Sequence, residues 1–270
     1  MNRRAVALAV ATVVYLAPQA SAEPILKARK YYGPIPTSSL SLRVGMLGGA
    51  SNGEMIDYLD GRTQPPFPVP ITDDFGNGLT FEIAYMHMPH PRFSVRVNTS
   101  MSLLKSSGSG VFVPQIPGVP DTIPLPALEY NREFDVQLFV VELSGLYHFT
   151  DAAVKEFQPY VGGGFSLGFP HEEYAETRVD EDTGEPYTDE IPGLPAQADE
   201  WGFSAGVHAV TGAVYYLTNR FGISAEARIQ LLEGKFDQLA VPNEVGEMEN
   251  VNFVVDYSGF YLTIGVTYAF

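Results

Sequence analysis

The chain has 270 residues, no cysteine and a formal net charge of -16 at pH 7. The lack of cysteine excludes disulfides and thiol chemistry, and the acidic balance excludes nucleic-acid binding through phosphate neutralisation. Lys and Arg together number only 16, whereas Gly, Tyr and Phe number 26, 15 and 17. This composition is typical of many strands edged by aromatic residues.

The first residues read as an export signal. Arg3 and Arg4 precede a short apolar stretch that ends in an Ala-Ser-Ala cleavage sequence. A membrane anchor needs about 20 apolar residues, and this stretch is shorter. We therefore expect residues 1–22 to be removed, residues 23–37 to form a periplasmic N-terminal segment and residues 38–270 to form one folded domain.

Alternating side chains predict strands along the rest of the chain. Apolar residues occupy every second position over several stretches, and a period of two places them on one face of a strand. Eight such strands are predicted, at residues 40–46, 79–85, 93–103, 134–149, 157–169, 201–217, 221–232 and 260–270. Leu138 and Val140 break the phase of the fourth strand, which we interpret as a β-bulge.

The connections between these strands alternate between short and long. The short ones are residues 89–92, 150–156 and 218–220, and the long ones are residues 48–78, 105–133, 170–200 and 233–250. An up-and-down barrel with both termini in the periplasm places every short turn on the periplasmic side and every long loop outside the cell.

The composition of the two strand faces decides which one is buried. A soluble lipocalin-like barrel would turn its apolar face inward, and periodicity alone does not exclude it. The polar face here is mainly Gly, Ser, Thr, Asn and Ala, which suits the crowded lumen of a narrow barrel better than a surface in water. We therefore predict an all-β, closed, up-and-down antiparallel transmembrane β-barrel of eight strands, with its apolar face toward lipid.

Three segments carry a resemblance to a known family. They are QPYVGGG at 158–164, YYLTNRFGISAEARI at 215–229 and GFYLTIGVTYAF at 259–270. The chain resembles the outer-membrane β-barrel domains of the OmpA, OmpX and OmpW kind. The resemblance implies an outer-membrane location among lipid and lipopolysaccharide. It also implies that the barrel assembly machinery reads the last strand, through Phe260, Leu262, Ile264, Val266, Tyr268 and Phe270.

Charged residues on the inward faces form a balanced set of three acids and three bases. The set is Arg43, Glu82, Arg96, Glu142, Glu226 and Arg228. Charges inside a narrow barrel must pair, so they are expected to form an ion-pair network that plugs the lumen and fixes the strand register. A gated path for ions or protons is the alternative, although eight strands leave room for little beyond side chains.

Catalytic and metal-binding constellations are weak in this sequence. His148 and His208, with Ser204 near the latter, do not assemble the His, Ser and Glu set of lipid A deacylases, so structural roles are favoured. Asp180, Asp182 and Glu185 offer alternating oxygen ligands for calcium, but the nearby glycine falls one position too early for an EF-hand loop. No cofactor is expected.

Negative charge is concentrated in the predicted loops. Residues 48–78 carry five acids and one base, residues 170–200 eleven and one, and residues 233–250 five and one. These loops would attract basic partners, or reach lipopolysaccharide phosphates through divalent cations. We expect a non-enzymatic role in envelope integrity or surface interaction through acidic extracellular loops. A narrow conduit for small apolar molecules and a lipid-modifying enzyme are the alternatives.

Overall fold

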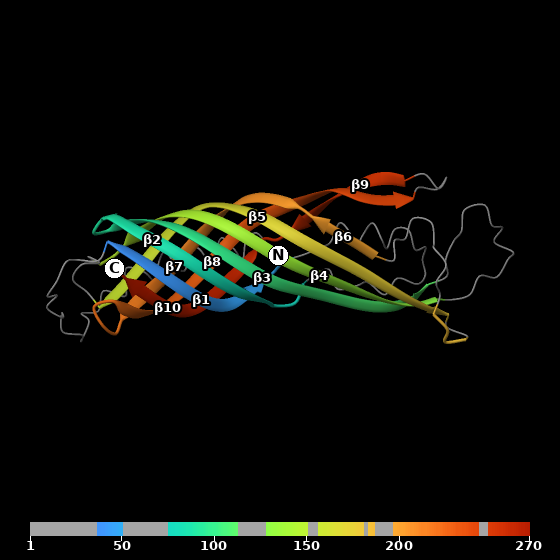
Figure 1. The fold of residues 1–270 in the computed structure, drawn as a ribbon, viewed down its shortest axis with the longest axis horizontal. Helices are drawn as coiled ribbons and strands as arrows, with labels where there is room; N and C mark the ends of the chain where they lie inside the picture. Colours follow the sequence, from blue (N-terminus) through green and yellow to red (C-terminus); the bar gives the residue numbers. More distant parts are fainter. Residues whose placement is uncertain are drawn as a thin grey trace, which may run out of the picture.

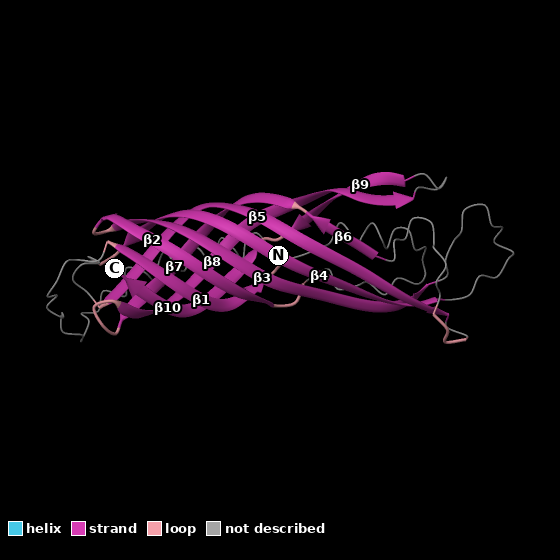
Figure 2. Cartoon of the chain, viewed as in Figure 1, coloured by secondary structure: helices cyan, strands magenta, loops and turns pink. Residues whose placement is uncertain are grey.

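The computed structural model describes residues 37–50, 75–112, 128–150, 156–180, 183–186, 197–242 and 248–270. The expected signal sequence lies outside these residues, as does the expected N-terminal segment apart from its last residue. The described residues form strands and turns (Figure 2). Within them, no helix is long and apolar enough to cross a membrane.

Ten strands form one antiparallel sheet that closes on itself (Figure 1). They are β1 (Ser38–Gly48), β2 (Gly78–His90), β3 (Phe93–Phe112), β4 (Leu128–His148), β5 (Phe157–Asp180), β6 (Gln197–Trp201), β7 (Phe203–Tyr216), β8 (Phe221–Pro242), β9 (Met248–Asp256) and β10 (Gly259–Ala269). Because β10 pairs with both β1 and β8, eight strands close a barrel, while β6 and β9 pair with the extended parts of β5 and β8. The predicted eight-stranded closed barrel is confirmed.

The register of the strands makes the barrel strongly sheared. Register partners followed around the barrel from Ser38 at the start of β1 lead back to β1 at Gly48, ten residues further along. A shear of this size tilts the strands by roughly 35–45° to the barrel axis. Inward side chains from strands that are not neighbours therefore reach the same level of the lumen.

The exterior of the barrel is apolar. On β10, Leu262, Ile264 and Val266 are between 50% and 58% exposed, whereas Thr263 is only 6% exposed. Large apolar side chains point outward in the same way on the other barrel strands. The eleven residues of β10, tilted as above, span roughly 27 Å, close to the apolar band of an outer-membrane barrel. The predicted outward direction of the apolar face is confirmed.

The predicted β-bulge in the fourth strand is wrong. The pairing of β3 with β4 runs without a register shift from Phe93 and Tyr147 to Phe112 and Leu128. Leu138 and Val140 are fully buried and point into the lumen. The apolar pattern changes phase because this level of the interior is itself apolar, so both faces of β4 carry apolar side chains there.

Three of the predicted long loops contain strand segments. β3 and β4 stay paired across much of residues 105–133, β5 continues through residues 170–180, and β8 and β9 pair within residues 233–250. Figure 1 shows these strands extending past the barrel. In β3 and β5 beyond the apolar band, both strand faces are largely polar, so the alternation that marks a strand is lost while the hydrogen-bonded ladder continues.

A charge in the apolar band should destabilise the barrel. We expect Ile264→Arg to lower the free energy of unfolding by about 2–4 kcal/mol, because a guanidinium at mid-membrane loses its hydration. Urea unfolding of the protein in lipid vesicles measures the change. Glu133→Arg, on the exposed face of β4 beyond the band, is the matched control and should change stability by less than about 1 kcal/mol. Equal effects of the two variants would contradict the assignment of the lipid-facing surface.

Candidate functional site

The six charged residues predicted for the lumen lie together in the middle of the barrel. They come from five strands, β1, β2, β3, β4 and β8, and none is more than 5% exposed. Only the tilt of the strands makes these contacts possible, since Arg96 and Glu226 lie on strands that are not paired. The network therefore ties distant parts of the wall to one another.

Glu226 on β8 is the acceptor for one side of the network. Its Oε2 atom accepts hydrogen bonds from Arg43 Nη1 at 2.8 Å, from Arg96 Nη1 and from the hydroxyl of Tyr160 at 2.7 Å. Arg43 also lies 3.0 Å from Glu82 Oε2 through its Nε atom. One carboxylate thus joins β8 to β1, β3 and β5.

Arg228, two residues further along β8, is the donor for the other side. Its Nη2 atom donates to Glu82 Oε1 at 2.6 Å, and its Nη1 atom donates to Glu142 Oε2 at 2.7 Å. Its guanidinium lies 4.1 Å from the ring centre of Tyr261, a cation–π contact. With three acids facing three bases, the buried cluster is neutral overall, as low-dielectric surroundings require.

Two apolar layers close the lumen on either side of this charged cluster. At the end with the short turns, the turn-end layer consists of Met86, Leu146, Tyr160, Val210 and Val214. At the other end, the hairpin-end layer consists of Leu104, Val136, Leu138, Val140, Leu232 and Tyr257, each at most 1% exposed. The prediction of a small, polar interior is correct for the middle of the barrel, but it missed the apolar layer on each side. Buried polar residues such as Ser94, His148 and Gln158 also lie at the turn end.

His148 and His208 point inward, away from lipid. Both ring nitrogens of His208 lie 2.8 Å from serine hydroxyls, those of Ser144 and Ser166. The Nε2 atom of His148 lies 2.9 Å from the hydroxyl of Ser94. Ser204, which sequence spacing had placed near His208, is not its partner. Neither histidine reaches a membrane lipid, so their geometry favours structural roles.

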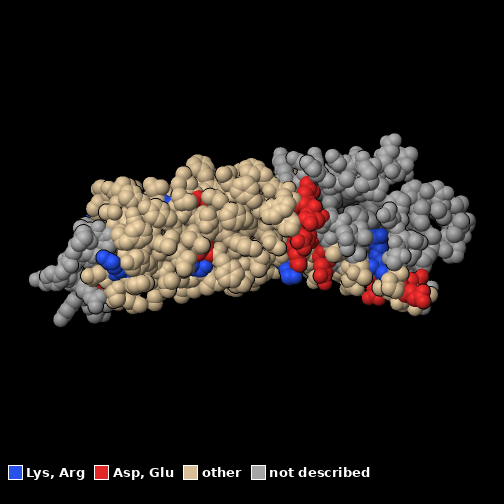
Figure 3. Space-filling model, viewed as in Figure 1, with Lys and Arg blue, Asp and Glu red and all other residues tan. Residues whose placement is uncertain are grey.

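Four exposed carboxylates and the half-buried Asp135 form an acidic rim just beyond the apolar band on the hairpin side. The acidic rim is Asp135, Glu173, Asp199, Glu233 and Asp256. Cross-strand register places Glu173 between Asp135 and Asp199, and places Glu233 opposite Asp256. Figure 3 shows a band of acidic side chains beside a barrel surface that carries few charged side chains. Like charges directly opposite each other are destabilising, so the rim lowers the stability of strand pairing.

One lysine is paired within the rim. Lys105 Nζ lies 2.8 Å from Asp135 Oδ2, and its side chain is 77% exposed. The hydrogen bond to Asp135 raises the pKa of Lys105 above its ordinary value. Neither Lys105 nor the rim was predicted from the sequence as a functional feature. In the sequence, the rim residues lie among the first charged residues after stretches of alternating apolar residues. This pattern indicates a rim only when the strand register places these residues side by side.

The residues considered for calcium lie at the tip of the β5 extension. The Oδ1 atom of Asp180 accepts a hydrogen bond from the backbone N–H of Thr183 at 2.9 Å. In the same turn, the backbone N–H of Asp180 donates to the carbonyl of Glu185, and its carbonyl accepts from the N–H of Gly184. Asp180 therefore serves a hairpin turn. Asp182 lies outside the described residues, and calcium binding here stays a prediction.

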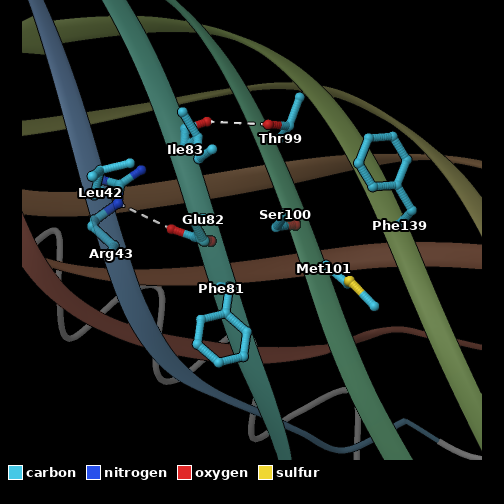
Figure 4. A pocket seen from close by; sticks show the side chains of 9 residues that line it. All are labelled: Leu42, Arg43, Phe81, Glu82, Ile83, Thr99, Ser100, Met101 and Phe139. Carbon is cyan, nitrogen blue, oxygen red and sulfur yellow. Dashed lines mark hydrogen bonds and ion pairs between the residues drawn. The ribbon is translucent and has the colours of Figure 1, made fainter.

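A shallow hollow of about 360 Å³ lies on the lipid-facing side of the wall (Figure 4). Its outward-facing lining residues are Leu42, Phe81, Ile83, Thr99, Met101 and Phe139. The ladders of β1–β2, β2–β3 and β3–β4 run past the hollow without a register shift. Arg43, Glu82 and Ser100, each at most 5% exposed, also line the hollow, and the continuous ladders leave no gap between the strands there.

Comparisons with solved structures find several outer-membrane proteins to which the chain is similar at low identity. OprG from Pseudomonas aeruginosa is 14% identical with a TM-score of 0.49, over 88% of this chain and 98% of that one. The N-terminal barrel of Pseudomonas aeruginosa OprF is 11% identical with a TM-score of 0.37, over 88% and 100%. Neisserial surface protein A is 13% identical with a TM-score of 0.41, over 86% and 96%. No protein-family model and no curated protein matches the chain.

The decisive observation is a closed sheet whose outer face is apolar around the whole barrel. In lipid every backbone polar group must be paired within the protein, and closed barrels do this with strands. The chain forms a closed, membrane-spanning β-barrel. The last strand of this barrel turns Phe260, Leu262, Ile264, Val266 and Phe270 outward. Recognition of these residues by the assembly machinery stays a prediction.

The ion-pair cluster should respond differently to two substitutions on β8. We expect Arg228→Met to lower the free energy of unfolding by about 3–5 kcal/mol, because it leaves Glu82 and Glu142 as buried carboxylates with reduced pairing. Gln230→Leu is the matched control. The side-chain amide of Gln230 is fully buried and forms no hydrogen bond to the residues described, so its loss should be neutral or stabilising.

Urea unfolding in lipid vesicles again measures both changes. If Arg228→Met proved as mild as Gln230→Leu, the cluster would not hold the wall together.

Proposed function

We propose that this protein is a non-enzymatic barrel that supports the integrity of the outer membrane through its acidic rim. The rim would engage lipopolysaccharide phosphates by way of divalent cations. The observation that carries the proposal is the position of the rim. Its carboxylates follow directly after the last lipid-facing residues, at the depth where acyl chains give way to headgroups. The rim would then lie on the outer side of the membrane, with the short turns and both termini in the periplasm.

The chemistry of the rim explains why a cation is needed. Phosphates and carboxylates repel each other, whereas a hard divalent cation accepts oxygen ligands from both. In the part of the chain that the structure describes, no group of three or more potential ligands could hold a metal ion alone. Lipid phosphates would therefore complete the ligand set, and the protein would bind cation and lipid together.

The closed lumen supports this proposal over transport. Side chains of the hairpin-end layer and the turn-end layer are almost fully buried, and the cluster between them is at most 5% exposed. A conduit for apolar molecules would need a path through both layers or through the wall. The location of His148 and His208 inside the barrel likewise favours a non-enzymatic role over action on membrane lipid.

Neutralising the rim should weaken the effect of magnesium. In bilayers that contain lipopolysaccharide, we expect Mg²⁺ to raise the temperature of heat unfolding. The D135N/E173Q/D199N variant should lose at least about half of this increase, since it removes cation ligands beside the lipid phosphates. The matched control E129Q/E133Q/E185Q removes three exposed acids further from the membrane and the same total charge. Equal losses in both variants would show that net charge, and not the rim, is responsible.

The barrel should not conduct ions. Planar bilayers containing the wild-type protein are expected to show no discrete current steps, because both apolar layers exclude water. The double variant L138S/L146S, with one substitution in each layer, should raise the conductance by making both layers polar. Stable channels in the wild-type protein would contradict the closed lumen and favour a conduit.

A further inference from the structure

The strand β6 is held against β5 at an electrostatic disadvantage. It pairs over five residues only, and two of the five register pairs place acids opposite each other. These are Glu172 with Glu200, and Glu173 with Asp199. Like charges in this position weaken strand pairing. Some compensating interaction must therefore hold β6 in place.

His171 on β5 provides that interaction. Its Nε2 atom lies 2.6 Å from Asp199 Oδ1 on β6, and its Nδ1 atom lies 3.7 Å from Glu173 Oε1. Its ring stacks on Trp201 of β6, with centroids 4.5 Å apart and planes 19° apart. When the imidazole is protonated, both nitrogens carry a proton and a positive charge toward the carboxylates. When it is neutral, one nitrogen loses its proton, and the positive charge beside Asp199 and Glu173 is lost.

Most of the charged groups near His171 are carboxylates. On its own strand and on β6 they are the carboxylates of Glu173 and Asp199, with Glu172 and Glu200 adjacent in sequence. On β4 its register partner is the uncharged Gln137, and Asp135 lies opposite Glu173. Lys105 is engaged by that aspartate. β7 begins at Phe203, which carries no charge.

We propose that His171 is a proton-controlled latch between β5 and β6. The protonated imidazole holds β6 on β5 by ion-pairing with Asp199 and Glu173, and loss of the proton releases β6 from the outer end of the barrel. Histidine changes charge between pH 5 and 8, so the latch would respond to mild acidification outside the cell. The latch uses two carboxylates of the rim, Glu173 and Asp199, but it does not require their contacts with lipid.

Trp201 is a built-in reporter for this latch. It is the only tryptophan in the chain and stacks directly on His171. Tryptophan fluorescence, with quenching by added acrylamide, therefore measures both the state of the imidazole and the accessibility of β6. The measurement uses the intact barrel in lipid vesicles without lipopolysaccharide or divalent cations, so failure of the rim proposal would not affect it.

We expect acrylamide quenching of Trp201 to rise by about twofold between pH 5 and pH 8, as β6 loses its pairing. His171→Gln should abolish this pH dependence. Asp199→Asn should keep Trp201 protected at pH 8, because it removes the repulsion that opens the strand. His90→Gln, which alters an exposed histidine at the far end of β2, is the matched control and should behave as wild type.

Two results would overturn the proposal. One is a rise in Trp201 emission with pH but no change in acrylamide access, which would mean that the imidazole titrates while β6 stays docked. The other is a pH dependence that persists in His171→Gln.

Discussion

Closure of the sheet is the constraint on which the rest of this structure depends. A strand in hydrocarbon has no water to bond its N–H and C=O groups, so the sheet must pair with itself around a full circle. Here β10 meets both β1 and β8 with a ten-residue shear, and the apolar alternation of each strand faces outward. Closure with eight strands leaves an interior only wide enough for side chains.

The narrow interior explains the arrangement of charge. Buried ions are tolerated only when they are paired, and the Glu226 and Arg228 contacts satisfy three acids with three bases. Apolar layers above and below exclude water and strengthen those ion pairs. With the lumen closed, the charge available for contact with other molecules lies outside the membrane. The acidic rim and the β5–β6 pairing are accordingly where the proposals for function are placed.

The sequence predicted the closed barrel and the direction of its faces because alternation reports the environment of each side chain directly. It also identified the six lumen charges, from their positions on polar faces. Their partners were not predictable, since Arg96 meets Glu226 only through the shear. Because Leu138 points into an apolar part of the interior, the sequence pattern predicted a bulge where the strand is regular. The strand segments beyond the membrane were not predicted, because the apolar alternation does not continue through them. Tyr160 was missed because it lies at an inward position with no charge to mark it.

Accessibility of spin labels on the last strand tests the central claim most directly, and a chain without cysteine permits single-site labelling. Labels introduced by Leu262→Cys, Ile264→Cys and Val266→Cys should collide readily with oxygen, which is concentrated in hydrocarbon. They should collide rarely with a water-soluble nickel chelate. A barrel with its apolar face in lipid requires this result at all three positions. Frequent collisions with the nickel chelate, or protection from both reagents, would contradict the account.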